Sequence, residues 1–216
     1  MLLRTKLFGH TYEFADLKEL LAKANEEKSG DQQAGIAARS AAERVAARYV
    51  LAEVPLSALR ENPVVPYDQD EVTRAIDDAI NETIYEEIKG WTVGEFREWL
   101  LSNKTTGADI ARISRSLTGE MIAAVAKLMG NLDLVYAARK IRVVTHCQNT
   151  MGLRGTIGSR LQPNHPTDSV EGIRAATYEG LSYGSGDSVI GINPSDDTVG
   201  SVSRLLDDNA TKAKEK

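Results

Sequence analysis

The residue types best suited to chemistry lie at Arg160 and Gln162, near the end of an expected extended stretch over 152–162. Alternate side chains of a strand share a face, so these two point the same way. The loop PNHP (163–166) follows them directly and marks the carboxyl end of the strand, where parallel α/β sheets bind ligands. A guanidinium and a carboxamide can together orient a small polar substrate. The alternative is an arginine that simply reaches solvent.

Asn193 ends the next expected strand, over 188–192, at the equivalent position. Asparagine is depleted in strands and common in turns, so a plain turn before Pro194 also accounts for it. Geometry favours a binding site, because two successive parallel strands would bring Arg160, Gln162 and Asn193 to the same end of a sheet.

Other patterns favour structure over chemistry. The sequence GSGD (184–187) precedes a strand instead of following one, which is the wrong order for a dinucleotide-binding turn. His146 and Cys147 are adjacent and would face opposite sides of a strand, and the other histidines lack ligand spacing. We therefore expect neither a metal site nor a cysteine nucleophile. The acidic pairs at 77–78 and 86–87 fit the solvated face of a helix.

The elements that would position these residues alternate between strand and helix. A helix capped by Asp168 or Ser169 follows the extended stretch, the strand over 188–192 comes next, and an amphipathic helix covers about 198–208. This order predicts a parallel sheet covered by helices. Two strands would leave an open apolar edge, so we expect the chain to be the front part of a longer protein.

The first 140 residues of the chain carry the capping residues and apolar periodicity of a helical region. Capping-box spacing marks helix starts at Ser40 and Thr92, and the first of these helices is expected to bury Val45, Tyr49 and Val50. The expected helices cover about 16–29, 40–54, 70–89, 92–101, 107–115, 119–129 and 131–140, and a short β-branched strand covers 141–145. The helix over 70–89 is expected to be the longest, because isoleucines recur every four residues through most of this stretch without a break.

Amino-acid usage changes near 140–150. Residues 1–140 hold 10 of the 12 aromatic side chains, whereas residues 141–216 hold 9 of the 17 glycines. We therefore predict a helical N-terminal region over 1–145 and the start of an α/β domain over 146–216.

Composition excludes several classes of protein. The 216 residues carry 26 Lys and Arg against 31 Asp and Glu, which argues against a broad basic surface for nucleic acid. The single cysteine cannot form an intramolecular disulfide and fits a reducing cytosol. No apolar stretch of about 18 residues could span a membrane, and the N-terminus lacks the features of a secretory signal.

Long collinear stretches give a more specific indication. The chain resembles the heavy (large) chain of ethanolamine ammonia-lyase, an adenosylcobalamin-dependent enzyme, over almost its whole length. The stretches that carry the resemblance are LFGHTYEF (7–14), LAKANEEKSGD (21–31), ERVAARYVL (43–51), RENPVVPYDQDEVTR (60–74), EMIAAVAKLMGNLDLVY (120–136), SRLQPNHPTD (159–168) and SVIGINP (188–194).

The resemblance implies a helical N-terminal region followed by the first two strand–helix units of an incomplete (β/α)8 TIM barrel. It implies that ethanolamine is converted to acetaldehyde and ammonia. Homolysis of the cobalt–carbon bond yields an adenosyl radical that abstracts hydrogen from the carbon bearing the hydroxyl group. By their place in the family motifs, Arg160, Gln162 and Asn193 match substrate-binding positions, and Pro194 matches a position against the cobalamin. No other catalytic residue is assigned.

The resemblance also implies partners and a location. These are a light (small) chain, further heavy chains in a hetero-oligomer, and the cytoplasm, with a bacterial microcompartment as the more specific expectation. By the same resemblance, the stretches 147–150, 154–155 and 157–159 depart from the family's usual sequence, and the family's acidic substrate-binding residues would lie beyond position 216. We therefore expect no turnover by this chain alone. The alternatives are a non-catalytic helical assembly module or remnant of the heavy chain, and a different barrel enzyme with the same strand-end residues.

Overall fold

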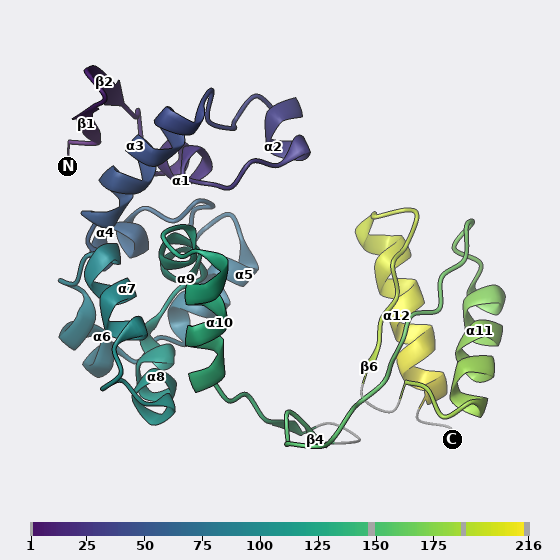
Figure 1. Ribbon diagram of the computed structural model, residues 1–216. Coiled ribbons are helices and arrows are strands. Elements are labelled where there is room, and N and C mark those ends of the chain that lie inside the picture. Colours follow the sequence, from purple (N-terminus) through teal and green to yellow (C-terminus); the bar gives the residue numbers. More distant parts are fainter. Residues whose placement is uncertain (1, 147–149, 187–188, 214–216) are drawn as a thin grey trace. The chain divides into compact units, whose positions relative to one another are not determined.

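The computed structural model describes residues 2–146, 150–186 and 189–213 and is an α/β structure with short strands (Figure 1). The chain divides into two compact units, Met1–Ile141 and Arg142–Lys216. The first unit opens with an antiparallel hairpin, β1 (Arg4–Leu7) and β2 (His10–Glu13), which the sequence did not predict. Its turn uses Phe8 and Gly9 at positive φ angles of 53° and 78°.

Helices make up the rest of the first unit. They are α1 (Leu17–Lys23), α2 (Ser29–Gln33), α3 (Ala41–Ala52), α4 (Leu56–Glu61), α5 (Glu71–Asp78), α6 (Glu82–Ile88), α7 (Val93–Leu101), α8 (Gly107–Ile113), a 3-10 turn η1 (Ser114–Ser116), α9 (Gly119–Lys127) and α10 (Asn131–Lys140). Most of them share one apolar core, which extends from Phe14 to Met129, whereas α2, α5 and α10 contribute no residue to it. At its centre Phe96 stacks on Trp99 with ring centroids 6.2 Å apart.

Local signals placed several helix starts correctly. Asp16 caps α1 by accepting a hydrogen bond from the backbone N–H of Glu19 at 2.7 Å, and Thr92 and Glu95 form the predicted capping box of α7. The first helix, however, ends at Lys23 and not near residue 29. The side chain of Arg48, on α3, donates to the carbonyl of Ala24 at 3.0 Å and so satisfies the end of the shorter helix.

The predicted long helix over 70–89 is wrong, because the chain breaks into α5 and α6 at Asn81. The Asn81 carboxamide accepts a hydrogen bond from the backbone N–H of Ile84 at 3.2 Å, and its own backbone N–H donates to the carbonyl of Arg115 at 2.8 Å. A continuous helix would need that N–H for a carbonyl four residues earlier. The isoleucine periodicity therefore runs through two separate helices.

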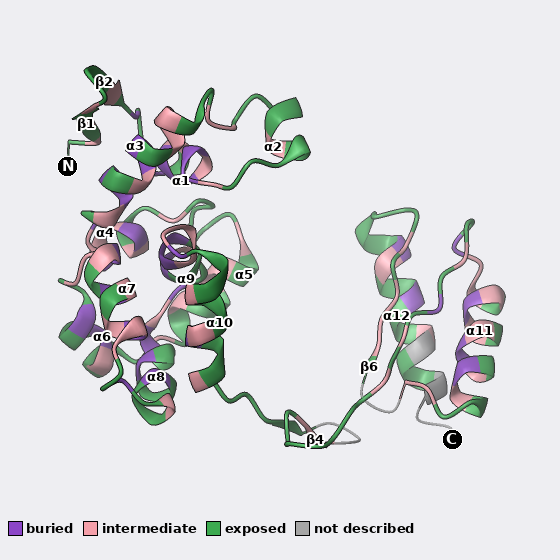
Figure 2. Cartoon of the chain, viewed as in Figure 1, coloured by how far each residue is buried: buried purple, intermediate pink, exposed green. Residues whose placement is uncertain are grey.

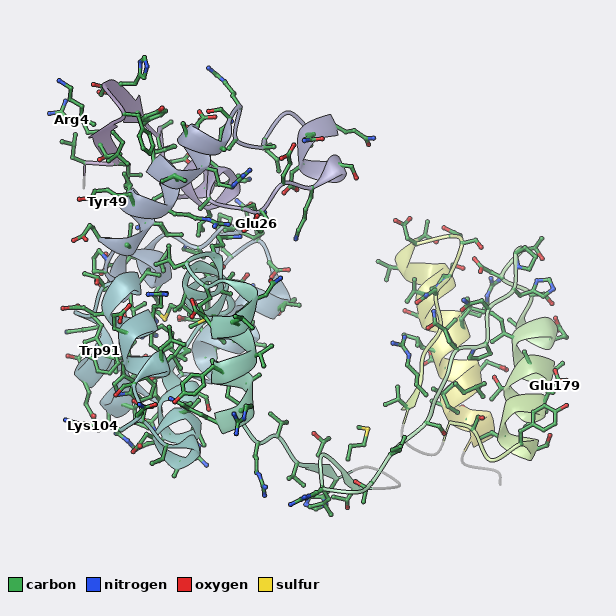
Figure 3. All side chains as sticks on the ribbon, viewed as in Figure 1. Arg4, Glu26, Tyr49, Trp91, Lys104 and Glu179 are labelled. Atoms are coloured by element: carbon green, nitrogen blue, oxygen red, sulfur yellow. The ribbon has the colours of Figure 1, made fainter. Side chains whose placement is uncertain are left out.

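The buried face of α3 also differs from the prediction. Val50 is buried as expected, but Tyr49 is 58% exposed and Figure 3 shows it pointing away from the helices. Val45 is exposed as well, and Ala46 and Ala47 are fully buried in its place. Small side chains on this face allow α1 and α7 to pack closely against α3.

The second unit contains β3 (Thr145–His146), β4 (Thr150–Met151), β5 (Arg160–Leu161), α11 (Val170–Ser182), β6 (Val189–Ile190) and α12 (Val199–Ala213). β3 pairs antiparallel with β4, and β5 pairs parallel with β6. The parallel pair confirms the predicted strand–helix–strand–helix order. The predicted strand over 141–145 is wrong except at its last residue, since β3 begins at Thr145. Cys147, Asp187 and Ser188 lie outside the described residues.

Helix α11 covers the parallel pair through one stripe of positions. Its buried residues are Ile173, Thr177 and Gly180, spaced by four and three, and they form the buried stripe seen in Figure 2. A Cβ atom at Gly180 would collide with the side chain of Leu161, so the glycine lets β5 approach the helix closely. Leu161 therefore faces α11.

Candidate functional site

The strand pair of the second unit places the residues singled out by the sequence. We call Arg160, Gln162, Asn193 and Pro194 the rim residues. Arg160 pairs with Val189 across the parallel strands, and Leu161 pairs with Ile190. Since Leu161 faces α11, the alternation of side chains turns Arg160 to the opposite face, away from that helix.

The guanidinium of Arg160 lies over the backbone of Gly191. A Cβ atom at position 191 would be 2.6 Å from Nη2 of Arg160 and 3.0 Å from its Nε, so only a glycine leaves this space free. Within the part of the chain that the structure describes, no carboxylate forms an ion pair with Arg160. Its donors are therefore open to a bound molecule.

Asn193 is held by a side chain where the strand ladder stops. The last backbone bond of the ladder runs from the N–H of Gly191 to the carbonyl of Leu161 at 2.9 Å. Pro163 has no N–H with which to continue it. The carboxamide of Asn164 instead accepts the backbone N–H of Asn193 at 3.1 Å. The loop that follows β6 is thus held beside the end of β5.

Asp168 makes a second connection between the loop that follows β5 and the loop that follows β6. One carboxylate oxygen accepts the backbone N–H of Ser195 at 2.9 Å, and the other accepts that of Asp196 at 2.7 Å. These donors hold the pKa of the Asp168 carboxyl below its usual range. The sequence offered either Asp168 or Ser169 as the cap of this helix, and the structure selects Ser169, which caps α11 by accepting from the N–H of Gly172 at 3.2 Å.

The rim residues lie in or directly beyond the paired strand ends of the second unit. Gln162 directly follows β5 and is exposed, Asn193 is exposed, and Pro194 is partly buried. Among the described residues, no hydrogen bond joins the side chains of Arg160, Gln162 and Asn193. One guanidinium and two carboxamides are therefore available at this end of the pair.

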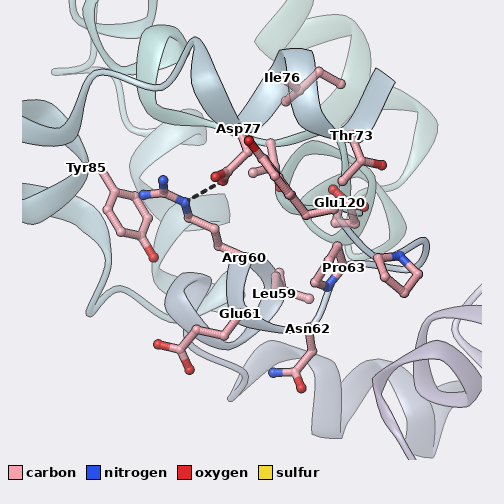
Figure 4. Close-up of a pocket in the computed structure, with 13 residues that line it drawn as sticks. Leu59, Arg60, Glu61, Asn62, Pro63, Thr73, Ile76, Asp77, Tyr85 and Glu120 are labelled. Atoms are coloured by element: carbon pink, nitrogen blue, oxygen red, sulfur yellow. Dashed lines mark hydrogen bonds and ion pairs between the residues drawn. The ribbon is translucent and has the colours of Figure 1, made fainter. Parts of the chain in front are cut away.

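A cavity in the helical unit has a different character. It has a volume of about 760 Å³ and lies between α4, α5 and α6 (Figure 4). Its arginine, Arg60, is already paired with Glu82 at 2.6 Å and Asp77 at 2.8 Å, and lies 4.4 Å from the ring centre of Tyr85. Both carboxylates raise the pKa of Arg60 above its usual value. This network links three helices and leaves Arg60 no free donor pair for a ligand.

The described residues offer neither a metal-binding cluster nor a membrane-spanning helix. No group of three or more His, Cys, Asp or Glu side chains there could hold a metal ion. No helix in the described ranges is both long and apolar enough to cross a membrane.

Comparison with known proteins decides the family. A family model described as ethanolamine ammonia lyase large subunit matches residues 12–214. The chain belongs to the ethanolamine ammonia-lyase large-subunit family. It is 52% identical to the ethanolamine ammonia-lyase large subunit of Escherichia coli over 207 residues, and 51% identical to that of Salmonella typhimurium. The match covers 96% of this chain and 46% of each relative, so the chain spans about half the length of these large subunits.

Proposed function

We propose that this chain contributes the ethanolamine-binding residues Arg160, Gln162 and Asn193 to a lyase that forms acetaldehyde and ammonia. The observation that carries the proposal is the parallel pairing of β5 with β6. It turns Arg160 away from α11 and seats its guanidinium over Gly191, while Gln162 and Asn193 follow the ends of the two strands. Ligands bind at this end of parallel strands in α/β proteins.

The donor set suits an amino alcohol. Ethanolamine carries a cationic ammonium group at one end and a hydroxyl group at the other. The guanidinium of Arg160 repels the ammonium group and can donate to the hydroxyl oxygen. The carboxamide oxygens of Gln162 and Asn193 can accept hydrogen bonds from the ammonium group. Together these three side chains would fix the direction in which the substrate lies.

Adenosylcobalamin is the cofactor of the proposed reaction. The described residues fit one edge of so large a group, because Pro194 is uncharged and partly buried and adjoins Asn193. Asn164 and Asp168 hold the backbone on either side of Pro194. When bound, the cofactor supplies the radical that starts the reaction. The residues of this chain hold the substrate and one edge of the cofactor.

We also propose the architecture and assembly of the complete enzyme. The elements β5, α11, β6 and α12 are the first two strand–helix units of a (β/α)8 barrel, preceded by a helical domain over 1–145. Closure of such a barrel needs eight units, so the chain alone should be inactive. The complete protein would assemble with a small subunit and further large subunits. A bacterial microcompartment is its proposed location.

The test uses a hybrid large subunit, in which this chain replaces the matching part of the Escherichia coli protein, assembled with the small subunit. With adenosylcobalamin and ethanolamine the hybrid should form acetaldehyde, whereas the isolated 216-residue chain should not. Arg160→Ala should lower kcat/KM at least about a hundredfold, and Gln162→Ala about tenfold. Arg139→Ala, an exposed arginine on α10, is the matched control. An active hybrid that tolerates Arg160→Ala as well as Arg139→Ala would refute the proposal.

A second candidate function is a non-catalytic assembly module formed by the helical unit. The observation in its favour is a set of exposed apolar side chains on α5 and α10, with Val72 66% and Leu132 84% exposed. Size-exclusion chromatography of the chain mixed with the small subunit, together with the activity of the hybrid, distinguishes the lyase from the assembly module. Co-elution without cofactor, together with an inactive hybrid, would favour the assembly module.

A further inference from the structure

We propose that Asp168 is a positioning residue that fixes the loop carrying Asn193 and Pro194 against the end of β5. This inference rests on the proposed function, because it assigns Asp168 a task only if the rim residues bind ethanolamine together. Asp168 would act through the backbone of the neighbouring loop and would not touch the substrate.

The geometry of Asp168 fits a clamp between two loops. Asp168 is only 7% exposed. Both of its carboxylate oxygens accept backbone N–H groups, from Ser195 at 2.9 Å and from Asp196 at 2.7 Å. Its backbone has a positive φ of 50°, a conformation that aspartate and asparagine tolerate better than most residues. The carboxylate thus reaches back to a loop that follows it by 27 and 28 positions.

Asn193 needs such a clamp because the strand ladder stops before it. Beyond the bond between Gly191 and Leu161, no backbone bond among the described residues joins the two strand ends. Asn164 holds the N–H of Asn193, and Asp168 holds the two N–H groups that follow Pro194. Side-chain acceptors therefore decide how far Asn193 lies from Arg160.

The chemistry of the clamp requires a carboxylate. Two successive N–H donors approach two oxygens, and an ionised carboxylate is an acceptor at both. The lowered pKa of Asp168 agrees with an ionised group at neutral pH. An asparagine would keep the backbone conformation and one acceptor, but its NH2 group would face the second N–H and could not accept it.

The first experiment observes the clamp without catalysis. In the 216-residue chain, Asp168→Asn should change the amide NMR shifts of Ser195 and Asp196 and speed their hydrogen exchange at least about tenfold. Asp197→Asn, a neighbouring exposed aspartate, is the control and should leave both amides unchanged. Unchanged exchange of both amides in Asp168→Asn would overturn the clamp.

The second experiment tests positioning in the hybrid enzyme. Asp168→Asn should raise KM for ethanolamine about tenfold with a smaller change in kcat, because a misplaced Asn193 weakens substrate binding. The thermal midpoint should stay close to that of Asp197→Asn. If Arg160→Ala lowers kcat/KM but Asp168→Asn leaves KM unchanged, only the positioning role is overturned. If Arg160→Ala also has no effect, the proposed function fails and the inference fails with it.

Discussion

At the scale of single residues, the position of Arg160 depends on shape more than on charge. No carboxylate within the described residues pairs with its guanidinium, which lies instead over the bare backbone of Gly191. Gly191 directly follows β6, and a glycine in or beside a strand often marks a place where another group approaches the backbone closely. The approaching group here is the side chain proposed to bind the substrate hydroxyl.

Gly191→Ala should therefore impair function while sparing the fold. The new Cβ would lie 2.6 Å from Nη2 of Arg160 and would push the guanidinium aside. Because this is the flexible end of a side chain, the free energy of unfolding should change by no more than about 0.5 kcal/mol. In the hybrid enzyme we expect kcat/KM for ethanolamine to fall about tenfold, measured by acetaldehyde release.

Gly200→Ala provides the control for this prediction, since a Cβ atom at Gly200 would have no neighbour within 4 Å. Equal kcat/KM values for the two alanine variants would show that the seat of Arg160 at Gly191 has no functional role.

At the scale of elements, the break between α5 and α6 shows how a distant contact overrides local periodicity. Four-residue spacing of isoleucines predicts one helix, and helix-forming residues fill most of the stretch. Yet the backbone N–H of Asn81 bonds to Arg115, and its carboxamide caps α6. Val72, which the same four-residue spacing placed on the apolar face, is 66% exposed on α5.

Asn81→Ala should weaken the unit without joining the two helices. Loss of the N-cap should cost about 1 kcal/mol of unfolding free energy, whereas the bond from the backbone N–H to Arg115 remains. Urea unfolding followed by circular dichroism measures the first effect, and an unchanged helix signal reports the second. Thr83→Ala, at an exposed position of α6, should cost less than about 0.5 kcal/mol. A gain in helix signal for Asn81→Ala would contradict the explanation of the break.

At the scale of the whole molecule, the two units differ in the size of their cores. Every residue of the main apolar cluster lies between Phe14 and Met129, in the first unit. In the described part of the second unit, the large buried apolar side chains are Ile173 and Leu205. Buried apolar area supplies most of the free energy of folding. The second unit should therefore open more easily.

Hydrogen exchange followed by mass spectrometry tests this difference. Amides of α3, α7 and α9 should exchange much more slowly than those of α11 and α12, since local opening follows local burial. Exchange at equal rates in both sets of helices would mean that the chain unfolds as one cooperative block.

Acid should destabilise the helical unit. Arginine partners or capping groups lower the pKa of six of its carboxyl groups, namely Glu26, Asp70, Glu82, Glu87, Asp109 and Asp133. For each, the pKa in the folded state is below that in the unfolded state, so the unfolded state binds more protons as pH falls. The stabilisation is complete above the unfolded pKa values, about 4, and is lost as pH falls through the folded ones.

Thermal melts at pH 7, 5, 3 and 2 should show this loss as a falling midpoint below about pH 4. The arginine pairs also predict a lower midpoint at pH 7 in about 1 M salt, where exposed ion pairs are screened. A midpoint that stays constant from pH 7 to pH 2 would contradict the first expectation, and an unchanged midpoint at pH 7 in about 1 M salt would contradict the second.

Local sequence determined several helix starts and the order of the elements in the second unit. The caps at Asp16, Ser40 and Thr92 and the parallel strand–helix–strand–helix order over the second unit were predicted, because capping and periodicity act within a few residues. Side-chain alternation also turns Arg160 away from the face of β5 that Leu161 presents to α11. That Arg160, Gln162 and Asn193 bind one substrate stays a prediction.

Only the tertiary structure decided where helices end and what holds the strand ends together. The first helix ends where Arg48 reaches the carbonyl of Ala24, 24 positions away, and Asp168 clamps a loop 27 positions along the chain. Residues that are so far apart in the sequence form no recognisable local pattern, since they meet only after the chain has folded. For the same reason, no pattern in the sequence could show that Arg160 rests on Gly191.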